Sequence, residues 1–375
     1  MSDILPWVLV GFWLFGFWFL WRIPVPGNRR LSDPEARSLS VIVPARNEEE
    51  NLDHLLESLR AQHPPPMETI VVDDQSEDGT AEVARRGGCR TLRSRDLPPG
   101  WTGKPWACMQ GARMARGDLL LFLDADTLLA QGGLPRLLES LPGDGGLVTV
   151  QPYHRMKRAY ERLAAVFNII VLAGSNAFTP LGARRKPMGA FGPCLLCSRK
   201  DYFAVGGHER VRAEILENVA LGKVFLEAGY RVFCYGGKGV LSFRMYAGGV
   251  RAMVEGFAKS FGVGAQAIAW VHMLLIVCWV FGAVSVTRHA VQTAVLGDAA
   301  PLLPWAGLYT LYAVQFFWML FRIGNFGAWP ALLFPVPILF FVAVFFLSLF
   351  KTAFVKQVRW KGRTVSTRGS KEADP

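Results

Sequence analysis

The chain has 375 residues, of which 51% are hydrophobic and only 19% are charged. This composition excludes an ordinary soluble domain and favours a membrane protein. The formal net charge of +11 is typical of proteins that meet anionic lipid headgroups or anionic substrates. Aromatic and basic residues do not alternate as they do in RNA-recognition modules, so we expect no nucleic-acid partner.

Residues 1–29 are predicted to form an N-terminal membrane anchor. The apolar run at 4–21 lacks a basic start and a small-residue cleavage site, which favours an uncleaved helix over a signal peptide. Arg22, Arg29 and Arg30 follow it, and basic flanks of membrane helices are typically cytoplasmic.

Residues 30–245 are predicted to form a cytoplasmic α/β domain. A β-branched strand at 38–46 precedes a helix with leucines at 52, 55, 56 and 59. A second strand ends at Asp73 and Asp74, and a third precedes Asp124. Parallel strands that end in polar residues describe an open sheet whose ligand crevice lies at their carboxyl ends.

Four short clusters fall at that edge: "PARNEE" (44–49), "DDQS" (73–76), "WTGKPWA" (101–107) and "DAD" (124–126). Their carboxylates suit base and ribose hydrogen bonds, and Lys104 suits a phosphate. A strand-end acid suits Mg²⁺ or Mn²⁺ held between two phosphates. The clusters together predict a site for a nucleoside diphosphate.

With these motifs the chain resembles the family-2 inverting glycosyltransferases, which have a GT-A-like nucleotide-diphospho-sugar transferase fold. The segments "TVQPYH" (149–154), "AFGP" (190–193), "GGH" (206–208), "SFRMY" (242–246) and "WKGR" (360–363) extend the resemblance. They are similar to bacterial carotenoid glycosyltransferases of the 4,4'-diaponeurosporenoate type and, more distantly, to ceramide glucosyltransferases.

The resemblance implies a role for each residue of the donor site. Asp124 would contact the ribose, Asp126 the metal and Lys104 the diphosphate of a UDP-sugar. The residues that would surround the base and ribose are Pro44, Arg46, Glu48 and Asp74. We interpret Asp73 and Asp78 as turn caps instead.

The resemblance also places an acidic pair at a helix start, where this chain reads Glu217-Asn218. An amide cannot take a proton, so the role of catalytic base falls to Glu217, with Glu214 as the alternative. An acceptor that is already an ionised carboxylate needs little base, which suits a carotenoid acid.

The remaining candidate residues would contact the acceptor or the diphosphate. His154 and His208 have a competing interpretation as hydrogen-bonded structural residues. Gly192 lies in "GAFGP" (189–193), a close-approach loop. The segment 242–262 lacks the Gln-x-x-Arg-Trp motif of processive relatives, which favours single transfer. Its candidates are Arg244, Tyr246 and Arg251, and an ordinary interfacial helix is the alternative.

Residues 246–266 are predicted to be an interfacial helix region, 267–350 a transmembrane region and 351–375 a basic cytoplasmic tail. If all three apolar segments (267–287, 302–321 and 329–350) crossed the membrane, the tail would lie outside the cytoplasm. Its basic residues predict a cytoplasmic tail, so one segment must not cross. Segment 329–350 contains Pro330, Pro335 and Pro337, which favours a re-entrant or interfacial path. "CLLC" (194–197) is interpreted as two core thiols, and no cysteine framework is expected.

The sequence therefore predicts a multi-pass enzyme of a bacterial inner membrane. It would be a metal-dependent inverting hexosyltransferase that moves one hexose from a UDP-sugar to a lipophilic acceptor, with a carotenoid acid as the first choice. Polyprenyl phosphate, ceramide-like lipid and diacylglycerol are alternative acceptors. A non-catalytic sugar-nucleotide-binding scaffold is the alternative outside the enzyme class, favoured only by Asn218.

Overall fold

The computed structural model describes residues 4–27, 38–182, 185–214, 216–297, 299–354, 357–360 and 363–366. Contacts divide the chain into two compact units. The helical unit comprises Met1–Ile23, His154–Arg185 and Met245–Lys351, and the sheet unit comprises Pro24–Tyr153, Lys186–Arg244 and Thr352–Pro375. Residues 154–185 therefore group with the helices, although they lie inside the 30–245 domain expected from sequence.

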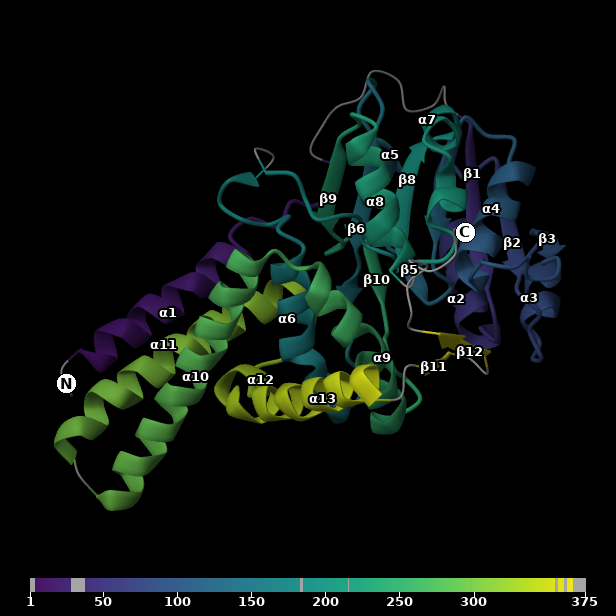
Figure 1. The fold of residues 1–375 in the computed structure, drawn as a ribbon. Helices are drawn as coiled ribbons and strands as arrows, with labels where there is room; N and C mark the ends of the chain where they lie inside the picture. Colours follow the sequence, from purple (N-terminus) through teal and green to yellow (C-terminus); the bar gives the residue numbers. More distant parts are fainter. Residues whose placement is uncertain are drawn as a thin grey trace, which may run out of the picture. The chain divides into compact units, whose positions relative to one another are not determined.

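A seven-stranded sheet forms the centre of the sheet unit, in the order β3-β2-β1-β4-β8-β6-β9 (Figure 1). Strands β1, β2, β3 and β4 are parallel, and β8 is antiparallel to both β4 and β6. The bounds are β1 Leu39–Ala45, β2 Glu68–Asp73, β3 Arg90–Arg93, β4 Leu119–Leu123, β6 Leu147–Gln151, β8 Cys194–Ser198 and β9 Val232–Gly236.

Helices cover both faces of this sheet. Val41 and Val43 of β1 pack toward the leucines of α2 (Glu49–Arg60), whereas Ile42 packs toward α4 (Gly103–Met114). A strand alternates its side chains between two faces, so only a strand covered on both sides can be apolar throughout. The remaining helices here are α3 Thr80–Arg86, α5 Gly133–Leu138, α7 Arg199–Ala204, η4 Gly207–Val211 and α8 Glu217–Glu227.

Short strands complete the sheets. Strand β5 (Thr127–Leu129) pairs antiparallel with β10 (Leu241–Phe243) in a three-stranded sheet whose third member is β7 (Tyr153–His154). Strand β11 (Gln357–Trp360) pairs antiparallel with β12 (Arg363–Ser366). Most of the basic tail, as well as Arg29 and Arg30, lies outside the described residues.

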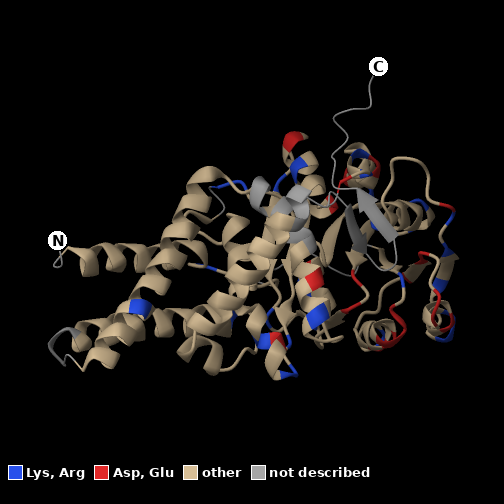
Figure 2. Ribbon diagram, turned by 60° about the horizontal axis from the view of Figure 1, so that its bottom comes forward, with Lys and Arg blue, Asp and Glu red and all other residues tan. Residues whose placement is uncertain are grey.

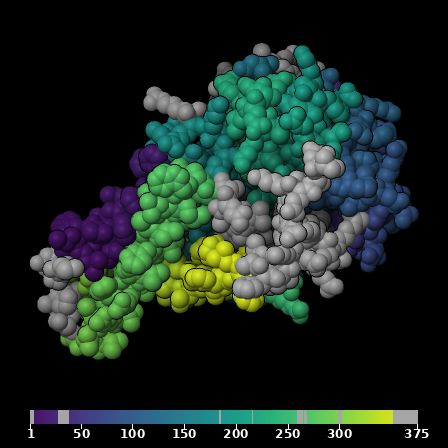
Figure 3. Space-filling model, in the orientation of Figure 1, coloured from purple at the N-terminus to yellow at the C-terminus, as the bar shows by residue number. Residues whose placement is uncertain are grey.

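The helical unit joins segments far apart in sequence. Helix α1 packs against α10 and α11, and all three lie side by side in Figures 1 and 3. Trp13 Nε1 donates to the Leu311 carbonyl at 3.0 Å. Gln315 Nε2 donates to the Trp13 carbonyl and its Oε1 accepts from Trp279 Nε1, each at 2.8 Å. The helices are α1 Leu5–Phe19, η2 Ala159–Ala164, α6 Ala165–Gly174, α9 Val250–Ala267, α10 Trp270–Leu296, α11 Ala299–Ile323, α12 Trp329–Leu332 and α13 Pro335–Phe354.

Charged residues are rare on the long helices of this unit, which are almost entirely tan in Figure 2. Within the described part of the chain, α10 is the one helix long and apolar enough to cross a membrane. Helix α1 and the described apolar part of α13, Pro335–Phe350, are shorter. Four segments were expected from sequence to be long enough to span a membrane, but among the described residues α10 alone has the required length and composition. Segment 329–350 is divided between α12 and α13.

Cys194 and Cys197 are buried on β8, and both are free thiols. Their interpretation as core thiols is confirmed.

Candidate active site

The loops that follow β1 and β2 hold each other at the carboxyl edge of the sheet. Ala45 is paired with Asp73 in the register, and Arg46 Nη1 donates to the Asp74 carbonyl at 2.9 Å. The Asp74 amide donates to the Ala45 carbonyl at 2.8 Å. Backbone pairing thus brings together Arg46 and Asp74, two of the predicted donor residues. Pro44 lies in β1 opposite Val72 of β2.

Two residues in these loops have left-handed backbones, Asn47 (φ 52°) and Gln75 (φ 57°). The Asn47 amide donates to Ser76 Oγ at 3.0 Å, and Asn47 Oδ1 accepts from the Glu77 amide at 2.8 Å. A left-handed non-glycine backbone costs about 1–3 kcal/mol and clusters at functional sites. Asn47 was not among the residues predicted from sequence, although an asparagine between a strand and a helix is a signal for this conformation.

Neighbouring side chains cap the helices that follow. Glu48 is half-buried; its amide donates to Thr80 Oγ1 at 2.9 Å and its Oε2 accepts from Asn51 at 2.7 Å. Asp73 Oδ1 accepts from the Ser76 amide, and Asp78 accepts from the amides of Thr80 and Glu49. The interpretation of Asp73 and Asp78 as turn caps is confirmed.

Lys104 is the centre of a charged cluster built from three elements. Its Nζ lies 2.6 Å from Asp124 Oδ1, after β4, and 3.4 Å from Glu217 Oε1, at the start of α8. Asn218 Nδ2 donates to the same Glu217 oxygen at 2.8 Å. Only 22% of the Lys104 side chain and 13% of that of Glu217 are exposed. The amino end of α8 also favours a carboxylate at its first residue.

This geometry keeps the Lys104 amino group protonated. Burial alone would lower its pKa, but the carboxylates of Asp124 and Glu217 outweigh burial and hold the pKa well above its usual value. The site therefore presents a permanent cation at the carboxyl edge of the sheet.

Gly192 lies beside this cluster. A Cβ at Gly192 would meet Asn218 Nδ2 at 2.8 Å and would lie 3.9 Å from Lys104 Nζ. Its loop is fixed because Thr149 Oγ1 donates to the Phe191 carbonyl at 2.9 Å and accepts from the Phe191 amide at 2.8 Å. The glycine keeps a backbone surface next to the ion pairs free of side chains.

Asp126 lies two residues after Asp124. The Thr127 amide and hydroxyl donate to the Asp124 carbonyl at 3.1 and 2.8 Å, so the two carboxylates share a tight turn between β4 and β5. Among the residues described, no group of three or more His, Cys, Asp or Glu side chains could hold a metal alone. Mg²⁺ commonly takes one or two protein carboxylates and completes its coordination with phosphates and water, so this pair fits a metal carried by a diphosphate.

Both histidines named as candidates are interior residues with aromatic neighbours. His208 is 0% exposed; its Nδ1 lies 2.8 Å from the Tyr202 hydroxyl and its ring lies against Phe122. Burial, reinforced by the charge of Lys104, lowers the pKa of His208 to about 3. His154 is 2% exposed beside Phe326 in the helical unit, and burial lowers its pKa to about 3.

The remaining candidates fall in the segment after β10. Arg244 is half-buried at the end of the sheet unit. Tyr246 and Arg251 belong to the helical unit. Tyr246 has a left-handed backbone (φ 56°), and its carbonyl accepts from the Tyr160 hydroxyl at 2.8 Å, a contact the sequence did not signal. Arg251 is 92% exposed and pairs with Glu255 on its own helix at 3.0 Å.

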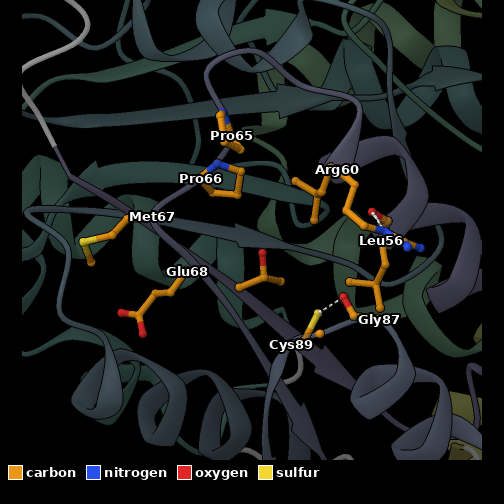
Figure 4. A pocket seen from close by; sticks show the side chains of 11 residues that line it. Leu56, Arg60, Pro65, Pro66, Met67, Glu68, Gly87 and Cys89 are labelled. Carbon is orange, nitrogen blue, oxygen red and sulfur yellow. Dashed lines mark hydrogen bonds between the residues drawn. The ribbon is translucent and has the colours of Figure 1, made fainter.

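A separate pocket of about 210 Å³ opens at the amino-terminal ends of β2 and β3 (Figure 4). It is lined by Arg60, Met67, Glu68 and Cys89 among others. These residues lie at the opposite ends of the strands from Asp74 and Asp124. The pocket therefore takes no part in the charged cluster.

Comparison with known proteins agrees with this architecture. Residues 40–201 match the family described as glycosyl transferase family 2. The 4,4'-diaponeurosporenoate glycosyltransferase of Staphylococcus aureus strain USA300 is 36% identical over 341 residues, which cover 88% of each chain. The chain belongs to glycosyltransferase family 2. The corresponding protein of S. aureus strain MRSA252 is 35% identical over the same length and coverage.

A solved structure has the same fold as this family 2 glycosyltransferase. It is the mannosyltransferase PcManGT from Pyrobaculum calidifontis in complex with GDP-Man and Mn²⁺, with a TM-score of 0.53, 19% identity, and coverage of 93% of this chain and 95% of that one. The expectation of a GT-A-like α/β fold is confirmed.

Proposed function

We propose that this family 2 glycosyltransferase transfers a single hexose from a UDP-sugar, with inversion, to the carboxylate of a membrane-soluble acid such as a carotenoid acid. The observation that supports this most is the cluster in which Lys104 joins Asp124 and Glu217 beside the Asn218 amide. The S. aureus relatives, named for a carotenoid carboxylate, support the choice of acceptor.

The donor would lie along the carboxyl edge of the sheet. Lys104 would bind the diphosphate, and Asp124 the ribose. The residues that would surround the base and ribose are Pro44, Arg46, Glu48 and Asp74. Asp126, with Asp124, would hold Mg²⁺ or Mn²⁺, which would neutralise charge on the departing diphosphate.

The acceptor oxygen would attack the anomeric carbon from the side opposite the diphosphate. The new bond joins that oxygen to the sugar, and the bond from the anomeric carbon to the diphosphate oxygen breaks, so UDP leaves with the electron pair. An ionised carboxylate carries no proton to remove, and Asn218, as an amide, could remove none. Glu217 would serve as base only for an acceptor that arrives protonated, such as an alcohol.

Membrane embedding would bring the acid to the site. The helical unit exposes large apolar side chains on α10, including Trp270, Leu274 and Phe281, and α10 has the length and composition of a spanning helix. A water-soluble acceptor would require no such surface. We propose that the protein is held in a bacterial inner membrane by several apolar segments, with the sheet unit on the cytoplasmic side.

The test uses the full-length protein in detergent with UDP-glucose and four acceptors of similar chain length: a carboxylic acid, an alcohol, a polyprenyl phosphate and a ceramide. We expect the carboxylic acid to be glycosylated fastest. Chelator, and Asp126→Ala, should each abolish transfer. Preference for the phosphate or ceramide would overturn the acceptor assignment. Full activity in excess chelator would overturn the metal role. The absence of both transfer and donor hydrolysis would support a non-catalytic scaffold.

A further inference from the structure

The carboxyl ends of α1 and α11 lie at one level of the helical unit. Arg322, in the last turn of α11, donates from Nη1 to the carbonyls of Leu20 and Trp21, just after α1. Its guanidinium lies 4.8 Å from the centre of the Trp318 ring. Arginine and tryptophan at the end of an apolar helix are typical of the boundary between lipid and water.

The segment that begins at His154 is fastened at this same level. His154 forms a β-bridge with Gly324, and the Asn325 amide donates to the His154 carbonyl at 3.0 Å. Asn325 Nδ2 also donates to the Met156 carbonyl at 3.4 Å. Because Gly324 and Asn325 directly follow α11, residues 154–156 lie beside the end of that helix.

Three exposed cations follow within four residues: Arg155, Lys157 and Arg158. Glu161 is the nearby carboxylate in sequence, but it is 2% exposed, and its Oε2 accepts from the backbone amides of Lys157 and Arg158 at 2.6 and 3.2 Å. It therefore fixes the backbone that presents the cations. Among the described residues, no carboxylate lies within salt-bridge distance of these three side chains.

Arg162, one turn further along, adds a fourth positive charge. Its Nε is buried and has no hydrogen-bond partner in the part of the chain that is described. Its guanidinium lies beside Gly327, in the same loop after α11. Arg162 is half-buried as a whole, and a phosphate oxygen is the acceptor that an arginine guanidinium suits best.

We propose that Arg155, Lys157 and Arg158, with Arg162 behind them, bind the headgroups of anionic phospholipids at the surface of the bilayer. The inference rests on the membrane embedding proposed above and adds a lipid class to it. Cations held at the lipid–water boundary attract anionic headgroups by roughly 1 kcal/mol each, which corresponds to about fivefold in relative affinity. Three cations on a fixed backbone therefore form a selective surface.

The experiment reconstitutes the full-length protein in vesicles of phosphatidylcholine containing a trace of dansyl-labelled phosphatidylglycerol or dansyl-labelled phosphatidylcholine. Energy transfer from tryptophan reports which labelled lipid stays at the protein. We expect the labelled phosphatidylglycerol to be preferred by roughly tenfold or more at low salt, and the preference to shrink in high salt because the charges are screened.

The variants separate charge from fold. Arg155→Gln/Lys157→Gln/Arg158→Gln should lose most of the preference, whereas Arg155→Lys/Arg158→Lys should retain it. The control Arg85→Gln/Arg86→Gln/Lys200→Gln removes the same charge from exposed positions of α3 and α7 and should behave like the parent protein.

Three results would overturn the proposal. The first is an equal loss of preference in the control variant, and the second is a triple variant with unchanged preference. The third is that UDP or inorganic phosphate displaces labelled phosphatidylglycerol, whereas NaCl of equal ionic strength does not. That result would show that the cations bind a free phosphate compound instead of a lipid headgroup. A protein that fails to float with any vesicle would instead overturn the membrane embedding itself.

Discussion

Asn218 donates a 2.8 Å hydrogen bond to Glu217, on the same carboxylate oxygen that lies 3.4 Å from Lys104 Nζ. Two donors thus hold one oxygen of the carboxylate in a fixed orientation. Asn218 Oδ1 is buried and has no hydrogen-bond partner among the residues described. Asn218, as an amide, cannot accept a proton, so Glu217 is the one base of this pair.

The first prediction concerns Glu217 as the catalytic base of this pair. Glu217→Gln should lower turnover with a long-chain alcohol by roughly 10² to 10⁴, because a base is lost. The loss with an ionised carboxylic acid should be smaller, since no proton is transferred. UDP affinity should stay close to that of the parent protein, and steady-state kinetics with both acceptors would measure the difference.

Asn218 variants complete this test. Asn218→Ala should cost less than Glu217→Gln with the alcohol. Asn218→Asp adds a second carboxylate and should raise turnover of the alcohol relative to the acid. An essential Asn218 beside a dispensable Glu217 would show that the roles are assigned to the wrong residues.

The second prediction concerns Gly192. In Gly192→Ala the new Cβ would meet Asn218 Nδ2 at 2.8 Å, so the amide that donates to Glu217 must shift. We expect transfer to fall at least about tenfold, measured with the carboxylic acid. Gly143→Ala is the matched control, because no atom lies within 4 Å of a Cβ at Gly143. Equal activity of the two variants would remove Gly192 from the site.

The third prediction concerns Lys104. Lys104→Met removes the cation that faces Asp124 and Glu217, so UDP affinity should fall by roughly tenfold or more. Stability should fall by about 1–3 kcal/mol, less than for a fully buried ion pair because the three side chains are partly exposed. Lys104→Arg should recover part of both losses. Calorimetric titration with UDP measures the affinity, and an unchanged affinity in Lys104→Met would contradict the assignment.

The fourth prediction is a pH dependence of stability. The folded-state pKa of His208 is lowered from 6.5 to about 3, so below pH 6.5 the unfolded chain binds a proton that the folded chain does not. Stability should therefore fall as the pH drops from about 6.5 toward 3, by up to about 1.4 kcal/mol per unit. His154 adds a second such contribution.

His208→Gln keeps a hydrogen-bonding side chain opposite Tyr202 and removes the titrating group. Its stability should depend less steeply on pH across this range than that of the parent protein, as measured by thermal unfolding of both proteins in detergent. Parallel pH profiles for the two proteins would show that His208 does not titrate as its burial implies.

The sequence predicted the charged carboxyl edge of the sheet because the signals there are local. Apolar strands that end in acids predicted that Asp74 and Asp124 lie at one edge, and the cluster "WTGKPWA" (101–107) added Lys104 to them. The ion pair between Lys104 and Glu217 was not predictable, since it depends on how α4 and α8 pack on one face of the sheet. The antiparallel insertion of β8 between β4 and β6 had no local signal either.

The burial of the two candidate histidines was not predictable from sequence. His154 and His208 sit in short motifs with glycine, tyrosine and proline neighbours, which are equally typical of a site and of a packed interior. Only the aromatic neighbours, Phe326 and Phe122, reveal the interior. Residues 154–185 group with the helices because contacts to distant segments such as Gly324 decide their place.

The anomeric configuration of the product tests the central claim most directly. Full-length protein is incubated with UDP-α-D-glucose and a long-chain carboxylic acid, and the coupling constant of the anomeric proton in the product is measured by NMR. In-line attack by the acceptor carboxylate predicts a β-glucosyl ester. An α-glucosyl ester, or donor hydrolysis without any ester, would contradict single-step transfer to a carboxylate at this site.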